Sequence, residues 1–145
     1  MTLEDRAPTE IVMDALHAVE ERQPDRLAAL YHPEIEFNWP PGLPYSGRFT
    51  GPAVKEMTQR FAATWVSLQP TEETRRIQPR ILAMGENGRV IVNYLWKGLD
   101  TKGRRFETEV LADYQVRDGR LARAQMFYYD LPGMITFLRG AGVLH

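Results

Sequence analysis

The carboxylate with the clearest chemical potential in this sequence lies near its C-terminal end. An extended segment runs to Tyr128-Tyr129-Asp130, and Asp130 shares the strand alternation of Met126 and Tyr128. A carboxyl group held among aromatic side chains has a raised pKa, so it can remove or return the proton of a carbon acid near neutral pH. Asp130 is therefore a candidate general base, with Tyr128 as a candidate for positioning substrate oxygen atoms.

Asp130 also has a purely structural interpretation, because Leu131-Pro132 follow it directly. Aspartate is a preferred N-cap residue, and proline suits the first turn of a helix. Capping fits the sequence context without further assumptions. The direction in which the Asp130 side chain points decides between the two interpretations.

His17 is the third candidate catalytic group. It lies one residue off the apolar face of the first predicted helix, where it could hydrogen-bond a ligand oxygen or relay a proton, or simply face solvent beside Glu20 and Glu21. The chain has three scattered histidines and no cysteine, and its acidic and histidine residues show no metal-ligand spacing. Because phosphate-binding and dinucleotide-binding glycine motifs are missing too, we expect neither a metal nor a cofactor.

Aromatic residues from several segments form a second candidate site. Each tyrosine or tryptophan has an apolar face and a polar tip, and a buried hydroxyl or indole N–H needs a partner. Taken singly, each is explained by core packing; as a set they favour a cavity for a small hydrophobic molecule. The predicted ligand-binding residues are Trp39, Tyr45, Phe61, Trp65, Tyr94, Trp96, Val110, Ala112, Tyr114 and Met126.

Three amphipathic helices are predicted in the N-terminal half. The first begins at Pro8 with Thr9 as its cap and has one apolar face, formed by Ile11, Val12, Ala15, Leu16 and Val19. The second opens at Pro24 and turns Leu27, Leu30 and Tyr31 inward. The third begins at Gly51-Pro52 and carries the longest stripe: Val54, Met57, Phe61, Trp65 and Leu68.

Strands occupy most of the rest. Residues 35–39 alternate as a half-buried strand, and from about residue 74 the period becomes two, with turns at 86–88, 102–103 and 118–119. One face of this meander is apolar, whereas Glu107, Glu109, Asp113 and Gln115 lie on the other. A short helix is predicted over 134–139. Helices followed by a meander indicate an α+β fold, a curved antiparallel sheet packed against three helices.

Length indicates the number of domains, and net charge limits the classes of binding partner. The 145 residues fit a single domain over 1–145, and 43% hydrophobic with 26% charged residues is typical of a globular protein. A formal net charge of -1 gives no electrostatic reason to bind nucleic acid or a membrane. Acidic residues interrupt the first fifteen positions, so no signal peptide is expected and a cytoplasmic location is predicted.

Several motifs together resemble a known family. Leu30-Tyr31-His32-Pro33-Glu34, Leu43-Pro44-Tyr45-Ser46-Gly47, the run 116–121 and Tyr128-Tyr129-Asp130 are similar, in order and spacing, to the SnoaL-like branch of the nuclear transport factor 2-like superfamily. The resemblance covers essentially the whole chain. It implies a cone-shaped α+β fold, a pocket between sheet and helices, and a homodimer through the outer sheet face.

The same resemblance bears on chemistry. Relatives include ketosteroid isomerase, limonene epoxide hydrolase and polyketide cyclases, the last of which use an aspartate near the end of the strand that holds Asp130. The isomerase's base falls on Asn38 or Trp39, and its oxyanion-binding pair falls on Ala15 and Ala112. The hydrolase's Asp-Arg-Asp set falls on Tyr94, Trp96 and Met126. Neither of these two mechanisms can operate here.

Two functions follow as hypotheses. The first is proton-transfer chemistry, such as isomerisation, cyclisation or dehydration, on a small hydrophobic oxygenated molecule, with Asp130 as base and Tyr128, Tyr45 and His17 positioning oxygen atoms. The second is a non-catalytic module that binds a small ligand or a second subunit. A closed apolar cavity with Asp130 turned outward would favour the second.

Overall fold

The computed structural model describes residues 6–144, in which helices pack against a sheet. In chain order the elements are α1 (Pro8–Glu20), α2 (Pro24–Ala29), β1 (Tyr31–Trp39), β2 (Gly47–Thr50), α3 (Ala53–Trp65), a 3-10 helix (Val66–Leu68), α4 (Glu72–Arg75), β3 (Arg80–Met84), β4 (Arg89–Leu99), β5 (Arg105–Arg117), β6 (Arg120–Tyr128) and α5 (Leu131–Gly140). The α+β class is confirmed.

The strands form a single six-stranded sheet in the order β2-β1-β6-β5-β4-β3. β1 and β6 run parallel, and every other neighbouring pair is antiparallel. The predicted all-antiparallel sheet is therefore wrong for this one pair. β1 precedes α3 and the meander returns to it only with β6, so the relative direction of these two strands is set by a long connection and not by a hairpin.

The predicted turns of the meander are confirmed. Asp118 and Gly119 join β5 to β6 with φ values of 55° and 71°, the left-handed geometry that a two-residue hairpin requires. Asn87 and Gly88 adopt φ values of 58° and 75° between β3 and β4. A Cβ atom on Gly88 would lie 2.1 Å from the carbonyl oxygen of Val116, so the two strand ends can approach only because this residue is glycine.

The helix boundaries differ in detail from the predictions. α1 begins at Pro8 with Ala7 in the cap position and no side-chain cap, so the predicted cap at Thr9 is wrong. Proline has no N–H to satisfy and is pre-set for the first helical position. Tyr31, predicted to end the second helix, is instead the first residue of β1. α5 is longer than predicted, since it starts directly after Asp130.

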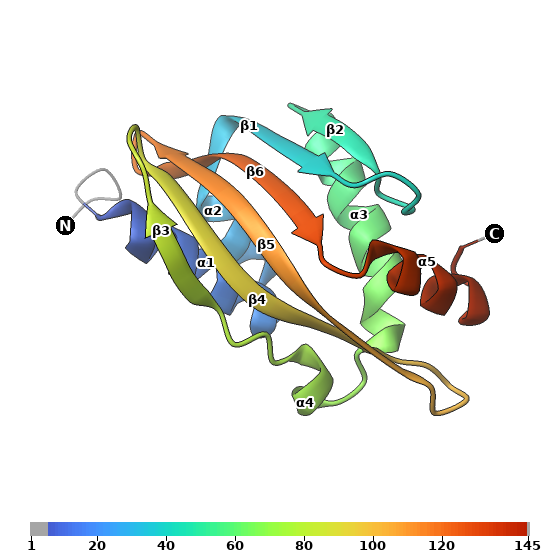
Figure 1. Ribbon diagram of the computed structural model, residues 1–145. Coiled ribbons are helices and arrows are strands. Elements are labelled where there is room, and N and C mark those ends of the chain that lie inside the picture. The colour runs from blue at the N-terminus through green and yellow to red at the C-terminus, as the bar shows by residue number, and fades with distance from the viewer. Residues whose placement is uncertain (1–5, 145) are drawn as a thin grey trace.

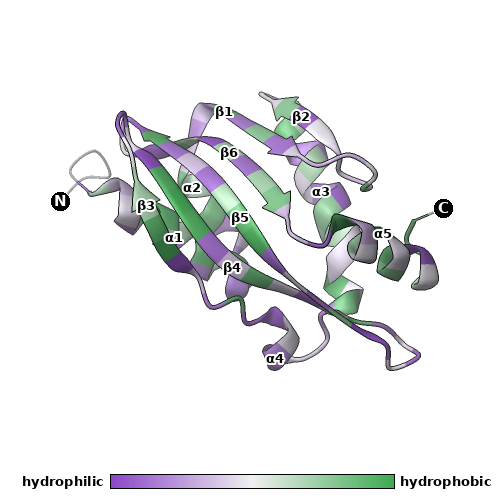
Figure 2. Cartoon of the chain, in the orientation of Figure 1, coloured by the Kyte–Doolittle hydropathy of each residue, from purple (hydrophilic) through white to green (hydrophobic). Residues whose placement is uncertain are grey.

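All of the long N-terminal helices lie on one side of the sheet. Figure 1 shows α1, α2 and α3 behind the strands, with α5 beyond the end of β6. The inward face of the sheet is the predicted apolar one: Val90 and Val92 of β4 and Val110 and Ala112 of β5 are fully buried. Figure 2 shows this apolar pattern along β4 and β5. Sheet and helices therefore enclose one core.

No helix of residues 6–144 lies over the opposite face of the sheet (Figure 1). Asp113 lies there in a two-bond pair with Arg89, whose Nε and Nη2 donate to its carboxylate at 3.0 and 2.6 Å. Glu107 and Glu109 are exposed on this face as predicted. In residues 6–144 no helix is both long and apolar enough to cross a membrane.

Candidate functional site

A pocket lies between the inward face of the sheet and helices α1, α2 and α3. Its volume is about 100 Å³. The walls come from α1, α2, α3, four strands and the segment between α4 and β3. They consist of Ala15, Leu16, Val19, Leu27, Tyr31, Phe37, Trp39, Met57, Thr58, Phe61, Ile77, Tyr94, Trp96, Tyr114, Leu121 and Met126. None of these described lining residues carries a charge. The pocket is therefore built to hold an apolar body.

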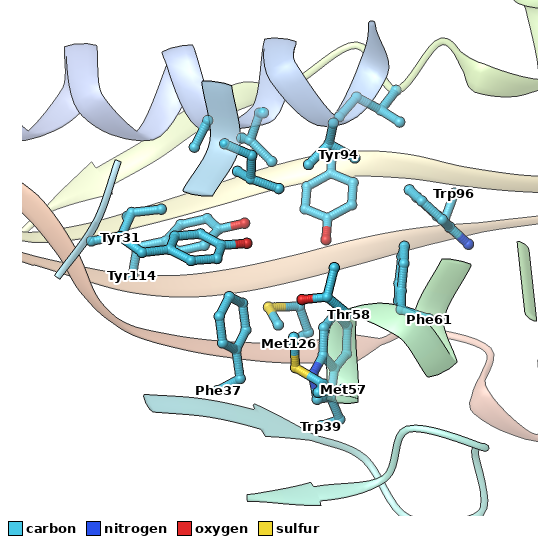
Figure 3. A pocket seen from close by; sticks show the side chains of 16 residues that line it. Tyr31, Phe37, Trp39, Met57, Thr58, Phe61, Tyr94, Trp96, Tyr114 and Met126 are labelled. Carbon is cyan, nitrogen blue, oxygen red and sulfur yellow. The ribbon is translucent and has the colours of Figure 1, made fainter. Parts of the chain in front are cut away.

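Four hydroxyl groups supply most of the polarity of the pocket. Figure 3 shows the oxygen atoms of Tyr31, Tyr94, Tyr114 and Thr58 pointing toward its middle. The Thr58 hydroxyl donates to the carbonyl oxygen of Val54 at 2.9 Å, within α3. The tyrosines come from three different strands, β1, β4 and β5, so only the folded sheet brings their hydroxyls together.

The three pocket tyrosines remain protonated. Burial raises the pKa of Tyr31 and Tyr94, and the neighbouring Tyr114 raises both further because two phenolates would repel each other. Burial also raises the pKa of Tyr114, although the nearby Tyr94 hydroxyl offsets part of this increase. At neutral pH these groups therefore act as neutral hydrogen-bond donors and not as bases.

The far end of the pocket is aromatic. Phe61 contacts Trp39 and Trp96 at ring-centroid distances of 5.4 and 5.3 Å. The indole N–H of Trp39 donates to the sulfur of Met57 at 2.9 Å. The indole nitrogen of Trp96 is buried and has no hydrogen-bond partner among the described residues. Trp96 meets Trp65 edge to face, with an interplanar angle of 89°.

Six of the predicted ligand-binding residues line the pocket: Trp39, Phe61, Tyr94, Trp96, Tyr114 and Met126. The other four lie outside its lining. Val110 and Ala112 are fully buried in the core. Tyr45 and Trp65 satisfy each other, since the Trp65 indole donates to the Tyr45 hydroxyl at 2.9 Å. A partner for each polar tip was available within the protein, so these two residues do not need a ligand.

Tyr128, a predicted catalytic residue, belongs to the same buried network. Its hydroxyl and that of Tyr45 share a hydrogen bond of 3.1 Å, and both residues lie outside the pocket lining. Burial raises the pKa of Tyr128 well above its ordinary value, and the nearby Tyr45 raises it further. The phenol of Tyr128 is thus a neutral structural group beside the pocket.

Asp130 does not face the pocket, which corrects the strand parity expected from the sequence. β6 ends at Tyr128, so the alternation stops two residues before Asp130. The Asp130 carboxylate accepts a hydrogen bond from the backbone N–H of Gly133 at 3.0 Å and caps α5. Its own backbone N–H donates to the Thr108 hydroxyl at 3.0 Å. Asp130 is exposed, as the capping interpretation requires.

His17 is likewise not among the lining residues. It sits in the last turn of α1 and is half-buried, while its neighbour Leu16 faces the pocket. Each residue turns a helix by about 100°, so a position one step off the apolar face points away from it. Residues 6–144 also contain no cluster of three or more histidine, aspartate or glutamate side chains that could hold a metal ion.

The sequence interpretation missed ten lining residues. Most belong to the helix stripes or to the alternation of β1, which were predicted as core: Ala15, Leu16, Val19, Leu27, Tyr31, Phe37, Met57, Thr58, Ile77 and Leu121. Helical spacing marks the inward face but does not distinguish a side chain that touches another from one that touches a void. Tyr31 carried a detectable signal, a tyrosine beside the start of a strand, yet it was assigned to a helix end.

Known structures share this architecture at low sequence identity. TerC, co-crystallized with polyporic acid, superposes with a TM-score of 0.73 at 17% identity, over 91% of this chain and 98% of that chain. An NTF2-like protein of unknown function from Burkholderia pseudomallei gives a TM-score of 0.73 at 18% identity, over 95% and 98%. A cystatin-like-fold protein of unknown function from Xanthomonas campestris gives 0.76 at 16% identity, over 92% and 98%.

These likenesses establish the fold, and the expected nuclear transport factor 2-like architecture is confirmed. A comparison with functionally curated proteins finds no match. At the level of sequence, the SnoaL-like domain matches residues 12–124. This match spans all of the pocket walls from α1 to β5 and reaches into β6. The chain belongs to the SnoaL-like domain family.

Proposed function

We propose that this domain binds a small hydrophobic molecule in the pocket between the sheet and α1 to α3, without catalysing proton transfer itself. The observation that carries this proposal is the composition of the lining, which is aromatic and aliphatic around a few hydroxyl groups and holds no carboxylate, imidazole or amine among the described residues. Ligand pockets of this kind use apolar area for affinity and a few polar groups for orientation.

The alternative of proton-transfer catalysis has less support. It would need a base within hydrogen-bond reach of a bound substrate. Asp130 is exposed and caps α5, and Tyr128 is paired with Tyr45 outside the lining. A tyrosine whose pKa is raised by burial accepts a proton poorly in its neutral form. Binding requires only the groups that do line the pocket.

The size of the cavity indicates the size of the ligand. An apolar cavity of about 150 Å³ holds one benzene molecule. The volume of about 100 Å³ found here is smaller, so the pocket accommodates at most one ring, and a larger molecule would extend from it toward solvent. TerC, a protein of similar fold, was co-crystallized with an organic molecule, polyporic acid, which is consistent with a pocket function for this architecture.

Toluene provides a direct test, because it fits one ring and makes no hydrogen bond. We expect saturable binding that raises the melting temperature. At a free toluene concentration ten times Kd, linkage stabilises the folded state by about 1.4 kcal/mol, which corresponds to roughly 3–6 °C for a chain of this size. The measurement is differential scanning calorimetry over a series of toluene concentrations.

A variant whose pocket is filled by a larger side chain is the matched comparison with the wild type. Ala15 of α1 lines the cavity and is 4% exposed, so Ala15→Leu places three additional carbon atoms in it. We expect Ala15→Leu to abolish the toluene-induced shift while circular dichroism shows an intact fold. Ala63→Leu, at an exposed position of α3, is the control and should respond like the wild type. An equal shift in all three proteins would refute binding in this pocket.

A further inference from the structure

The hydroxyl groups of Tyr31, Tyr94 and Tyr114 converge on the middle of the pocket (Figure 3). Tyr94 and Tyr114 are each only 7% exposed, so water outside the protein has little access to them. Each hydroxyl carries one O–H donor. Three donors from three strands are thus directed at one small volume inside an otherwise apolar wall.

The hydroxyls of Tyr94 and Tyr114 lie near each other, but none of the three hydroxyls makes a hydrogen bond of ordinary geometry to another group in residues 6–144. In residues 6–144 the tyrosine hydroxyls that make hydrogen bonds of ordinary length belong to Tyr45, Tyr128 and Tyr129. The fully buried side-chain atom without a partner among the described residues is the indole nitrogen of Trp96, so the three tyrosine oxygens are open to the cavity, and native structures rarely leave such polar groups unpaired. Donors left unpaired by the protein, in a pocket large enough for a ring, are the expected arrangement when a ligand supplies the acceptor.

The charge around the three hydroxyls limits the chemistry of that acceptor. Among the described lining residues there is no lysine, arginine or histidine, so a bound anion would have no opposite charge to replace the water it loses. The Thr58 hydroxyl already donates to the carbonyl oxygen of Val54, so its hydrogen is not available to the ligand either. A neutral oxygen acceptor satisfies the donors without introducing an unpaired charge.

Resting on the function proposed above, we propose that the pocket selects an uncharged molecule whose carbonyl oxygen accepts one or two hydrogen bonds from the hydroxyl cluster of Tyr31, Tyr94 and Tyr114. The ring of such a ligand lies against Trp39, Phe61 and Trp96, and its carbonyl group lies at the tyrosine end. Aryl ketones are the simplest members of this class. The apolar end provides affinity, and the three donors provide the selection for a carbonyl.

Three probes of nearly equal size separate the contributions of the apolar ring, the carbonyl group and a negative charge to binding. Acetophenone is a neutral carbonyl compound, ethylbenzene is its apolar analogue, and benzoate is an anion. One to two hydrogen bonds of ordinary strength should make acetophenone bind about 3- to 30-fold more tightly than ethylbenzene at pH 7. Benzoate should bind at least about 10-fold more weakly than acetophenone, because its charge is desolvated without a cationic partner. Isothermal titration calorimetry measures all three.

Phenylalanine variants assign the selectivity to the hydroxyls. Tyr94→Phe and Tyr114→Phe each remove one donor and leave the ring in place. We expect each to weaken acetophenone binding about 3- to 10-fold and to leave ethylbenzene binding unchanged within about twofold. Tyr129→Phe removes a tyrosine hydroxyl from an exposed residue outside the pocket and is the control, with wild-type affinity for both probes.

The outcomes distinguish this inference from the proposed function. If ethylbenzene and acetophenone bind equally, the pocket binds hydrophobic molecules but does not select a carbonyl, and the inference is overturned. Benzoate binding as tightly as acetophenone overturns it as well. If no probe binds, the proposed function itself fails. Preference for acetophenone that disappears in Tyr94→Phe and Tyr114→Phe, but not in Tyr129→Phe, supports both.

Discussion

Replacing Asp130 tests whether this residue is a helix cap or a catalytic group. Its carboxylate accepts from the backbone N–H of Gly133 at 3.0 Å at the start of α5. That helix packs into the core through Met134 and Leu138, both fully buried, so its stability is coupled to that of the whole domain. We therefore expect Asp130→Ala to lower the free energy of unfolding measurably.

The magnitude follows from two separate interactions. Loss of an N-cap side chain costs about 1 kcal/mol, and loss of a negative charge at a helix N-terminus costs about 0.3–1 kcal/mol. Asp130→Asn keeps an oxygen that can accept from Gly133 and loses only the charge. Asp130→Ala should thus be destabilised by roughly 1–2 kcal/mol, and Asp130→Asn by less than 1 kcal/mol.

Urea unfolding monitored by tryptophan fluorescence measures both variants. Salt adds a discriminating condition, because the charge component is screened whereas the hydrogen bond is not. The difference in the free energy of unfolding between wild type and Asp130→Asn should therefore be smaller at about 0.5 M NaCl, which is well above physiological ionic strength. Affinity for the pocket probes should be unchanged in both variants.

An unchanged free energy of unfolding in Asp130→Ala would refute the capping argument. If a substrate is identified and Asp130→Asn abolishes its turnover at full stability, the residue is catalytic and the proposed function is incorrect.

Two further predictions concern the surface. Burial raises the pKa of Asp14, but hydrogen bonds and charge from Arg26 and Arg6 outweigh this effect together, so the pKa is lowered overall. Such a carboxylate stabilises the folded state above its unfolded-state pKa, and this stabilisation is lost as pH falls through the folded-state pKa. The free energy of unfolding of Asp14→Asn should therefore be lower than that of the wild type by roughly 1 kcal/mol at pH 7 and equal to it at pH 2. A difference that stays constant across this pH range would contradict the assignment. The dimer implied by the family resemblance would cover Phe127 and Tyr129, which are 44% and 58% exposed on the outer sheet face. Light scattering should then give a dimer for the wild type and a monomer for Phe127→Glu, and a monomeric wild type would contradict it.

Most of the architecture could be predicted from local pattern. The alternation that placed Val90, Val92 and Val110 on one face was confirmed, as were the turns at Asn87-Gly88 and Asp118-Gly119. These features depend on the period of the backbone and on residues that tolerate positive φ, both of which are readable over a few positions. The parallel pairing of β1 with β6 was missed because no local signal sets it.

The candidate site was predicted less completely. Its aromatic character was apparent, and six of the expected residues do line the pocket. Tyr45 was misplaced because its partners are remote in sequence: the hydroxyl of Tyr128 lies 83 residues away and the indole of Trp65 lies 20 away. No pattern within a segment reveals that two buried polar groups will satisfy each other.

The sequence by itself determined that this chain forms helices over a curved sheet with an apolar, aromatic interior. Tertiary structure alone decided which polar groups in that interior remain unpaired and which way Asp130 points. Its backbone is held by the hydroxyl of Thr108, 22 residues earlier, where β6 has already ended. Periodicity is a local property of the chain, whereas the satisfaction of buried hydrogen bonds is a property of contacts between distant segments, and the chemistry of this pocket depends on the latter.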